Sequence, residues 1–384
     1  MKKITILIIL LLLPSLAWGA AATMYVTAAG AGDNSGDSWA NAMAYSDWET
    51  DAEGSAEAGD TYYFMEGEYT VSSDVNFNDN GTDVAPITLI GVKSGTTAEP
   101  PTIADYAYGD DRPLFTCGGD TFNNGDKQYF VMKNLRFTFL STLYYGLLIR
   151  GGYLDNVKAT GASNGEGIIR LEQSVGIRLE ATNSSTANAI YLKRSRLLYS
   201  YVHDSTKCIG GNSGVNQDTY VVGTIIDTCT TGIATEAAAY RQDVFANNTF
   251  YNNTTHISLG TPGGGEDSVA VIVNNIFDTG TTGITAVSTF GNARLDNNVY
   301  SNISGDDVSN VTKGPNAITS DITLTDPANG DFTLPNSSDA EGVGFQVDTN
   351  LGITGDYNVN IGVDQTDTQA GGGTNANGAV GIGF

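Results

Sequence analysis

An internal repeat limits this chain of 384 residues to a narrow group of folds. Four ten-residue stretches align without gaps, and each ends on isoleucine: Ser200–Ile209, Thr224–Ile233, Asn248–Ile257 and Asn275–Ile284. The isoleucine column extends upstream through Leu147, Ile169 and Ile190, so its members are 22, 21, 19, 24, 24 and 27 residues apart. A period of about 20–30 residues with short β-rich segments is typical of a solenoid, in which each repeat forms one turn.

Strand-forming and turn-forming segments alternate along the repeat. Short runs rich in β-branched and aromatic residues predict strands at Tyr129–Met132, Leu147–Ile149, Ile190–Leu192, Tyr220–Val222 and Val269–Val273. Gly, Asn, Asp and Thr cluster between these runs and predict turns. The sequence therefore predicts parallel strands stacked about 4.8 Å apart along the axis of a coil.

Two further patterns concern the stability of such a coil. Asn248, Asn275 and Asn298 share one column, where amide side chains can hydrogen-bond from rung to rung.

A solenoid also needs caps at its ends. The segment Ser46–Glu49 resembles a capping box that opens a short helix, with Trp48 and Ala52 on one face.

The chain begins with a predicted signal peptide. Lys2 and Lys3 precede an apolar run, Ile4–Leu13, and small residues favour cleavage after Gly19. The run is about ten residues long, whereas a membrane span needs about 20. We therefore expect an exported protein, secreted, periplasmic or at the cell surface, with no membrane insertion after cleavage.

The remaining chain is expected to form one capped rod. The predicted segments are a signal peptide (1–19), an N-terminal strand and capping helix (20–58), a parallel β-helix (59–300), final rungs with a C-terminal cap (301–368) and a Gly-rich flexible tail (369–384).

Charge and cysteine content exclude several classes of function. The formal net charge is −25, so binding to nucleic acid is not expected, because that needs a basic face. The three cysteines, Cys117, Cys208 and Cys229, cannot all pair with one another. With only two histidines and no Cys-x-x-Cys pair, a zinc site is not expected either.

Both ends of the repeat resemble a known family. The segments Tyr25–Thr27, Gly36–Ala42 and Ala58–Thr70 resemble the opening of right-handed parallel β-helix repeat proteins of the pectate-lyase-like superfamily. Asp326–Leu334 and Asn360–Gln365 resemble the closing segments of that family, whereas the stretch between them differs. The resemblance implies an all-β fold, a single-stranded right-handed parallel β-helix of about ten rungs with a short N-terminal capping helix. The architecture serves many activities, so it does not define the function.

A cluster of positive charge provides the first candidate site. Eight Lys and Arg lie between residues 150 and 207. Strand alternation places Leu147, Ile149 and their column partners inside, so two columns face outward: Leu148, Arg170, Tyr191 and Arg150, Glu172, Lys193.

The resemblance implies a lyase chemistry for these cations. In related lyases an Arg or Lys removes a proton beside a uronate carboxylate, often with Ca²⁺ bound to that carboxylate. The candidate catalytic residues are then Arg170, Lys193 and Arg194, and the candidate binding residues are Arg150, Glu172, Tyr191 and Arg196, with Tyr191 stacking on a sugar. The alternating signs of Arg150, Glu172 and Lys193 equally suit a self-neutralising ladder of surface charges.

His203, followed by Asp204, is the second catalytic candidate, as one half of an acid/base pair. Its column otherwise holds turn-type residues, Asp227, Tyr251 and Asp278, so a structural role is also consistent with the pattern.

Two functions remain open. The first is an exported protein with a carbohydrate- or surface-binding or structural role, whose partner is a polysaccharide or cell-surface glycan. The alternative is a polysaccharide lyase that performs β-elimination on uronate-containing glycans. The lyase needs a groove with converging Arg, Lys and carboxylate groups, whereas a flat face with paired charges favours binding. The sequence decides neither catalysis nor a need for Ca²⁺, and it does not indicate the oligomeric state.

Overall fold

The structure is a computed structural model that describes residues 21–340, except 78, 120, 125–126, 184, 212–216, 237–240, 262–268, 289–291 and 336–337. The predicted signal peptide, the predicted Gly-rich tail and the closing segment Asn360–Gln365 lie outside the described residues. Within the described part of the chain, no helix is long and apolar enough to cross a membrane.

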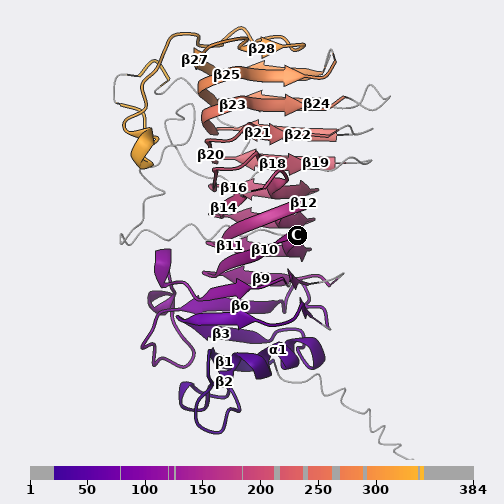
Figure 1. The fold of residues 1–384 in the computed structure, drawn as a ribbon, viewed down its shortest axis with the longest axis vertical. Coiled ribbons are helices and arrows are strands. Elements are labelled where there is room, and N and C mark those ends of the chain that lie inside the picture. Colours follow the sequence, from indigo (N-terminus) through magenta and orange to yellow (C-terminus); the bar gives the residue numbers. More distant parts are fainter. Residues whose placement is uncertain are drawn as a thin grey trace, which may run out of the picture.

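Parallel strands stack into a solenoid of about nine turns, with β1 and β2 near one end and β27 and β28 near the other (Figure 1). All strand pairings in the two sheets are parallel, as the repeat predicts.

The twelve-stranded sheet, called face A below, runs the length of the rod. Its strands, in spatial order, are β2 (Met43–Ala44), β1 (Thr23–Thr27), β3 (Thr61–Met65), β6 (Ile87–Val92), β9 (Phe130–Lys133), β11 (Gly152–Asp155), β13 (Val175–Ile177), β16 (Arg196–Leu198), β19 (Gln217–Val222), β22 (Arg241–Ala246), β24 (Val269–Val273) and β26 (Ala293–Asp296).

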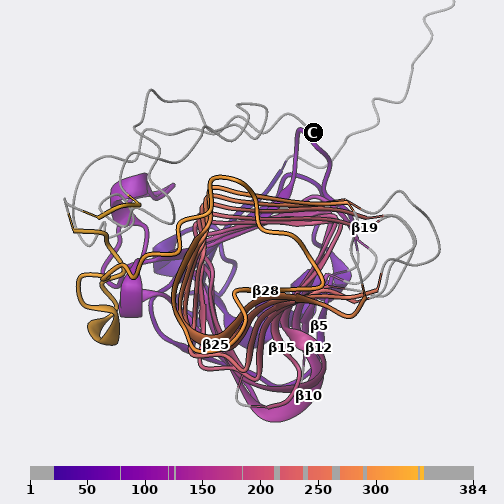
Figure 2. The same cartoon turned by 90° about the horizontal axis from the view of Figure 1, so that it is seen from above.

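The sixteen-stranded sheet forms two further faces, because four of its strands are long and bend from one face to the other. These four are β10 (Arg136–Arg150), β12 (Lys158–Glu172), β23 (Thr249–Leu259) and β25 (Ile276–Ala286). Their N-terminal halves continue face B, which includes β7 (Leu114–Cys117), β14 (Glu180–Asn183), β17 (Tyr201–His203), β20 (Ile225–Asp227) and β27 (Val299–Ile303). Their C-terminal halves continue face C, which includes β8 (Phe122–Asn123), β15 (Asn188–Lys193), β18 (Lys207–Gly211), β21 (Thr231–Ala234) and β28 (Val308–Ser309). The sheet also holds β4 (Glu68–Val71) and β5 (Val75–Asn76). Seen along the axis, the successive turns superpose around one central core (Figure 2).

The predicted isoleucine column is confirmed in register along face C. Leu147 pairs with Ile169, and the pairing continues through Ile190, Ile209, Ile233, Ile257 and Ile284. All seven side chains are at most 1% exposed and belong to the central core. Because alternate residues of a strand face opposite sides, their neighbours point outward.

The asparagine ladder is also confirmed. The side-chain oxygen of Asn275 accepts the backbone N–H of Asn248 at 3.0 Å, and that of Asn298 accepts the backbone N–H of Asn275 at 2.9 Å. The preceding residues, Asn247, Asn274 and Asn297, have φ between 49° and 56°. Asparagine tolerates this left-handed conformation, which explains its use at the turn from face A to face B.

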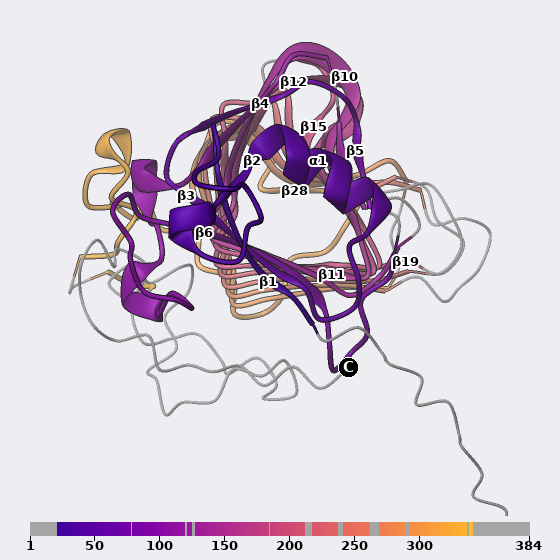
Figure 3. The ribbon, with the colours of Figure 1, turned by 90° about the horizontal axis from the view of Figure 1, so that it is seen from below.

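The capping helix α1 (Tyr45–Gly54) lies across the N-terminal end of the solenoid (Figure 3). Trp48 and Ala52 face the core and are fully buried, as the sequence predicts. The predicted capping box at Ser46 is wrong, since the helix begins two residues earlier in the chain: Ala44 is the N-cap and makes no side-chain cap bond. Burial of the aromatic face, rather than a cap, therefore stabilises this helix.

The described end of the chain, residues 310–340, returns along the outside of face B and is called the C-terminal strap below. It contains the short helix η4 (Pro327–Asn329). Ile322, Leu324 and Phe332 of the strap form an apolar cluster with outward residues of face B: Ile225, Ile276 and Val299.

A disulfide joins Cys208 on β18 to Cys229, which lies between β20 and β21 one turn further along the chain. Cys117 is a buried thiol on β7.

Candidate functional site

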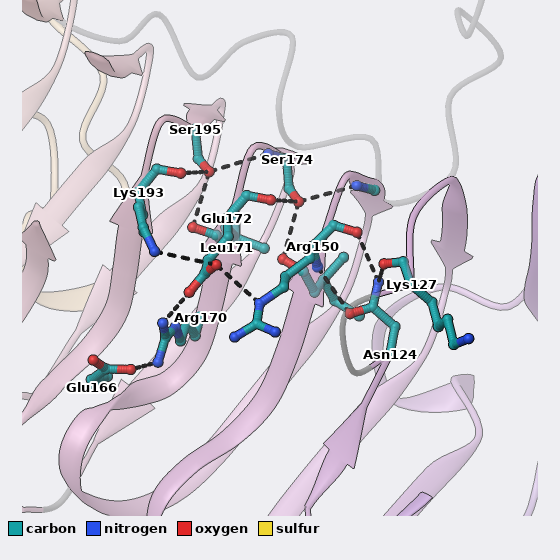
Figure 4. A network of polar contacts seen from close by, with 12 residues as sticks. Asn124, Lys127, Arg150, Glu166, Arg170, Leu171, Glu172, Ser174, Lys193 and Ser195 are labelled. Carbon is teal, nitrogen blue, oxygen red and sulfur yellow. Dashed lines mark hydrogen bonds and ion pairs between the residues drawn. The ribbon is translucent and has the colours of Figure 1, made fainter. Parts of the chain in front are cut away.

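The first candidate site lies on face C, where β10 and β12 end and β15 runs beside them. The register pairs Leu148 with Arg170 and Tyr191, and Arg150 with Glu172 and Lys193, so the structure confirms both predicted outward columns. Most of these side chains meet in one network of charges (Figure 4).

Glu172 is the centre of this network. Its Oε2 lies 3.0 Å from Nε of Arg150 and 3.5 Å from Nζ of Lys193, while its Oε1 pairs with Arg170. The residue is only 7% exposed. Burial opposes ionisation, but the charge and hydrogen bond of Arg170 outweigh it, together with Arg150 and Lys193, and hold the pKa of Glu172 below its usual value. Glu172 is therefore a buried carboxylate that orders three cations.

Arg170 is enclosed on several sides. One terminal nitrogen pairs with Glu172 and the other with Glu166, and its guanidinium lies 5.5 Å from the ring centre of Tyr191 and 5.9 Å from that of Tyr145. Both ends of the guanidinium are therefore engaged by carboxylates of the protein, so Arg170 bridges Glu166 and Glu172. The five residues Arg150, Glu166, Arg170, Glu172 and Lys193 are called the Glu172 cluster below.

The prediction of Tyr191 as an open stacking platform is wrong, because its side chain is covered. Tyr191 is 4% exposed, and burial raises its pKa. Tyr144, on the outward bend of β10, is 59% exposed and presents an aromatic ring to solvent. The sequence did not single out Tyr144, because the bend interrupts strand alternation.

The structure does not bring Arg194 and Arg196 into the Glu172 cluster. Arg194 is exposed in the turn after β15, with φ of 52°. Arg196 is on β16 of face A, where its guanidinium lies 5.3 Å from the ring centre of Tyr220. Both arginines therefore border the cluster at the corner between faces C and A.

His203 lies on face B and has different neighbours. Its Nδ1 is 2.8 Å from Oδ2 of Asp204, and its Nε2 is 3.3 Å from Oγ1 of Thr182 and 3.7 Å from Oε1 of Glu180. Burial lowers the pKa of His203, but the hydrogen bonds and charges of Glu180 and Asp204 outweigh it and raise the pKa.

Glu180 belongs to the same group. Lys158 pairs with it at 2.6 Å and Arg112 at 3.8 Å. Burial opposes ionisation, but hydrogen bonds from His203 and Lys158 and the charges of Lys158 and Arg112 lower the pKa of Glu180 to about 2. Sequence reasoning missed Thr182 and Glu180, although both lie one turn before β17, at the spacing of the repeat.

The residues of the Glu172 cluster do not fit Ca²⁺. This ion takes six to eight oxygen ligands, and both carboxylates of the cluster are engaged by Arg170. Over the described ranges, no group of three or more His, Cys, Asp and Glu could hold a metal ion.

Sequence comparison finds no protein-family model that matches and no curated protein that matches. Solved structures do match the fold. The pectate lyase Pel9A superposes with a TM-score of 0.58 at 14% identity, over 89% of this chain and 96% of that one.

Two weaker matches are an alginate lyase from Paenibacillus and a lacto-N-biosidase from Eubacterium ramulus. The alginate lyase has a TM-score of 0.46 at 13% identity, over 77% of this chain and 99% of that one. The lacto-N-biosidase has a TM-score of 0.44 at 11% identity, over 78% of this chain and 67% of that one. The strand topology and the match to Pel9A together establish that the chain has the pectate-lyase-like fold, a right-handed parallel β-helix.

Proposed function

We propose that the protein binds acidic polysaccharides through the surface around the Glu172 cluster. The observation that carries this proposal is the ordering of Arg150 and Lys193 by the buried Glu172, at 3.0 and 3.5 Å. The two side chains remain 30% and 33% exposed, so each can also contact a ligand. They occupy one column two rungs apart, which is about 10 Å.

Local charge supports an acidic ligand. Residues 150–207 contain eight Lys and Arg and five Asp and Glu, a local charge of +3 in a chain whose net charge is −25. An acidic polymer is repelled by most of this protein and attracted to these turns. The exposed ring of Tyr144 on the bend of β10 provides an apolar surface for a sugar ring.

A uronate lyase is the second candidate, and the resemblance in fold to a pectate lyase supports it. Such a lyase needs a base that is directed at the substrate. Lys193, the candidate base, already pairs with Glu172 of the protein itself, with Nζ 3.5 Å from Oε2. This pairing supports binding ahead of elimination.

We also propose that the protein acts outside the cytoplasm. The predicted signal peptide is one support. The Cys208–Cys229 disulfide is another, because disulfides persist in oxidising compartments.

Calorimetric titration of the chain lacking residues 1–19 with polygalacturonate, alginate and a neutral glucan tests the binding function. We expect binding to the two acidic polymers only, weakening as salt rises from about 0.05 to 0.5 M. The double variant Arg150→Ala, Lys193→Ala should bind about tenfold or more weakly, about 1.4 kcal/mol. Arg294→Ala, which removes an exposed cation of β26 on face A, is the matched control and should bind normally.

Equal affinity for the neutral glucan, or unchanged affinity of the double variant, would overturn the proposal. Ultraviolet absorbance of the same mixtures detects the unsaturated product of β-elimination. Product formation that disappears in Lys193→Ala would establish the lyase instead.

A further inference from the structure

A second group of polar residues, on face B, has the geometry of a nucleophile–base–carboxylate triad. Oγ1 of Thr182 lies 3.3 Å from Nε2 of His203, and Nδ1 of His203 lies 2.8 Å from Oδ2 of Asp204. These contacts join one side chain of β14 to the end of β17 and the turn that follows it. A hydroxyl within reach of an imidazole that a carboxylate orients is the signature of an activated nucleophile.

The contact to Asp204 selects the tautomer of His203. In the protonated imidazole, Nδ1–H faces Asp204 and Nε2–H faces Glu180. Once the Nε2 proton is lost, Nδ1–H still donates to Asp204, and Nε2 carries the lone pair that can accept the hydroxyl proton of Thr182. Asp204 reaches the imidazole because it has φ of 50°, which turns the chain directly after β17. One turn later, Asp227 takes the place of His203, and Thr228 takes the place of Asp204 with the same left-handed backbone conformation.

The imidazole is also held from behind. The ring of Tyr201 stacks on it with centroids 4.1 Å apart, and the hydroxyl of Tyr201 donates to Oδ2 of Asp227 at 3.2 Å. Phe332 of the C-terminal strap packs against Tyr201, with ring centroids 6.2 Å apart. The His203 side chain is 17% exposed, so the ring is fixed but still reached by solvent.

The column of Thr182 makes this arrangement distinct from an ordinary threonine ladder. Thr138 and Thr160 precede Thr182 at the same position of face B, and their hydroxyl groups contact each other at 3.3 Å. Only at Thr182 does the next turn of this column supply a histidine. Thr160 therefore provides a matched control on the same face.

We propose that Thr182, His203 and Asp204 form an acyl-transfer site that hydrolyses esters; the substrate class, O-acyl groups on sugars, rests on the proposed function. Oγ1 of Thr182 attacks the acyl carbonyl carbon and passes its proton to Nε2 of His203. The tetrahedral intermediate expels the alcohol, which takes that proton, and leaves an acyl ester on Thr182. Water then adds to this ester and gives a proton to His203. The second tetrahedral intermediate breaks its bond to Oγ1 of Thr182, which takes that proton back from His203, and the acid is released.

Neighbouring charges fit the charge changes of these steps. Asp204 is a positioning residue, and Glu180 adds a second carboxylate near the imidazolium that forms. Lys158, paired with Glu180 at 2.6 Å, is a cation on the same face. Burial lowers the pKa of His203, but the hydrogen bonds and charges of Glu180 and Asp204 outweigh it and raise the pKa, and Asp227 also interacts with His203. The rate should therefore rise with pH above 6.5.

A covalent probe and a chromogenic ester test the site without knowledge of the natural substrate. The purified chain is treated with a fluorophosphonate, and labelled peptides are located by mass spectrometry; hydrolysis of p-nitrophenyl acetate and release of acetate from acetylated pectin are measured in parallel. In the parent chain, in Thr182→Ser and in Thr160→Val we expect a label on residue 182 and hydrolysis of the ester. Thr182→Val and His203→Gln should lose both, and circular dichroism should show that they stay folded.

Hydrolysis that persists in Thr182→Val, a label on another residue, or no hydrolysis above the buffer rate in the parent chain at any pH would overturn the proposal. Binding of polygalacturonate to the same variants is measured separately. Because that binding depends on face C, its loss would count against the proposed binding function and would leave the test of the triad unaffected.

Discussion

The buried histidine of this protein predicts how its stability depends on pH. His256, on β23, is fully buried between Phe250 and Phe277, and burial lowers its pKa from 6.5 to about 3. Its Nδ1 contacts the side-chain amide of Asn253 at 3.2 Å. The imidazole is therefore neutral in the folded protein over the whole ordinary pH range.

The sign of the effect follows from the two pKa values. Between about pH 3 and pH 6.5 the unfolded chain binds a proton on His256 and the folded chain does not, so stability falls as the pH falls. The full gap is worth at most about 5 kcal/mol, at about 1.4 kcal/mol per pH unit. At about pH 4.5 the loss relative to neutral pH should be about 3 kcal/mol.

Urea unfolding of the parent chain and of His256→Gln, at about pH 7 and pH 4.5, measures this quantity. Glutamine keeps an oxygen that can accept from Asn253 and does not titrate. We expect the stability advantage of the parent chain over the variant to shrink by about 3 kcal/mol between the two pH values. Acidic groups common to both proteins cancel in this difference.

His203 supplies an internal control of opposite sign, because these two residues are the only histidines of the chain. Its folded-state pKa is raised, so its contribution is present below pH 6.5 and is lost as the pH rises through the folded value. The His203→Gln variant should therefore lose most stability at low pH. If the parent chain and His256→Gln have the same pH slope, the reasoning about His256 is refuted.

Three substitutions test other parts of the structure. Glu172→Gln leaves buried Arg170 without its central carboxylate and should lower the free energy of unfolding by about 3–5 kcal/mol. Arg150→Ala removes a partly exposed side chain and should lower it by about 1 kcal/mol or less. Equal losses for the two variants in urea unfolding would contradict this reasoning. Asn275→Ala removes several buried hydrogen bonds of the asparagine ladder, each worth about 1 kcal/mol, and should lower the urea midpoint of unfolding. An unchanged midpoint would show that the ladder contributes nothing to stability. Phe332→Ala should cost about 3 kcal/mol and make the C-terminal strap a preferred site of limited proteolysis, while an unchanged cleavage pattern would mean that this ring does not hold the strap.

The sequence predicts the solenoid well because one rule governs each turn. The column from Leu147 to Ile284 repeats at a spacing that only a coil satisfies, and strand alternation then assigns the outward residues. Both outward columns of the Glu172 cluster follow from this rule without any knowledge of side-chain contacts.

The parts that the sequence does not predict are those where this rule fails. The register between β10 and β12 shifts between Thr138 and Thr142 and again before Tyr145. Glu166 enters the cluster from this irregular part of β12, so no column places it beside Arg170. Tyr191 is buried in the same region, because Arg170, which pairs with Glu166, lies over the ring of Tyr191.

The Cys208–Cys229 disulfide has a mechanical consequence. A rod of stacked turns pulled from its two ends releases them one after another, because each turn is bonded mainly to its neighbours. The cross-link ties two cysteines that are 21 residues apart in sequence, so that loop cannot extend while the bond is intact. Under force the fully extended oxidised chain should therefore be about 70 Å shorter than the reduced chain. The disulfide thus limits how far this part of the solenoid can be stretched.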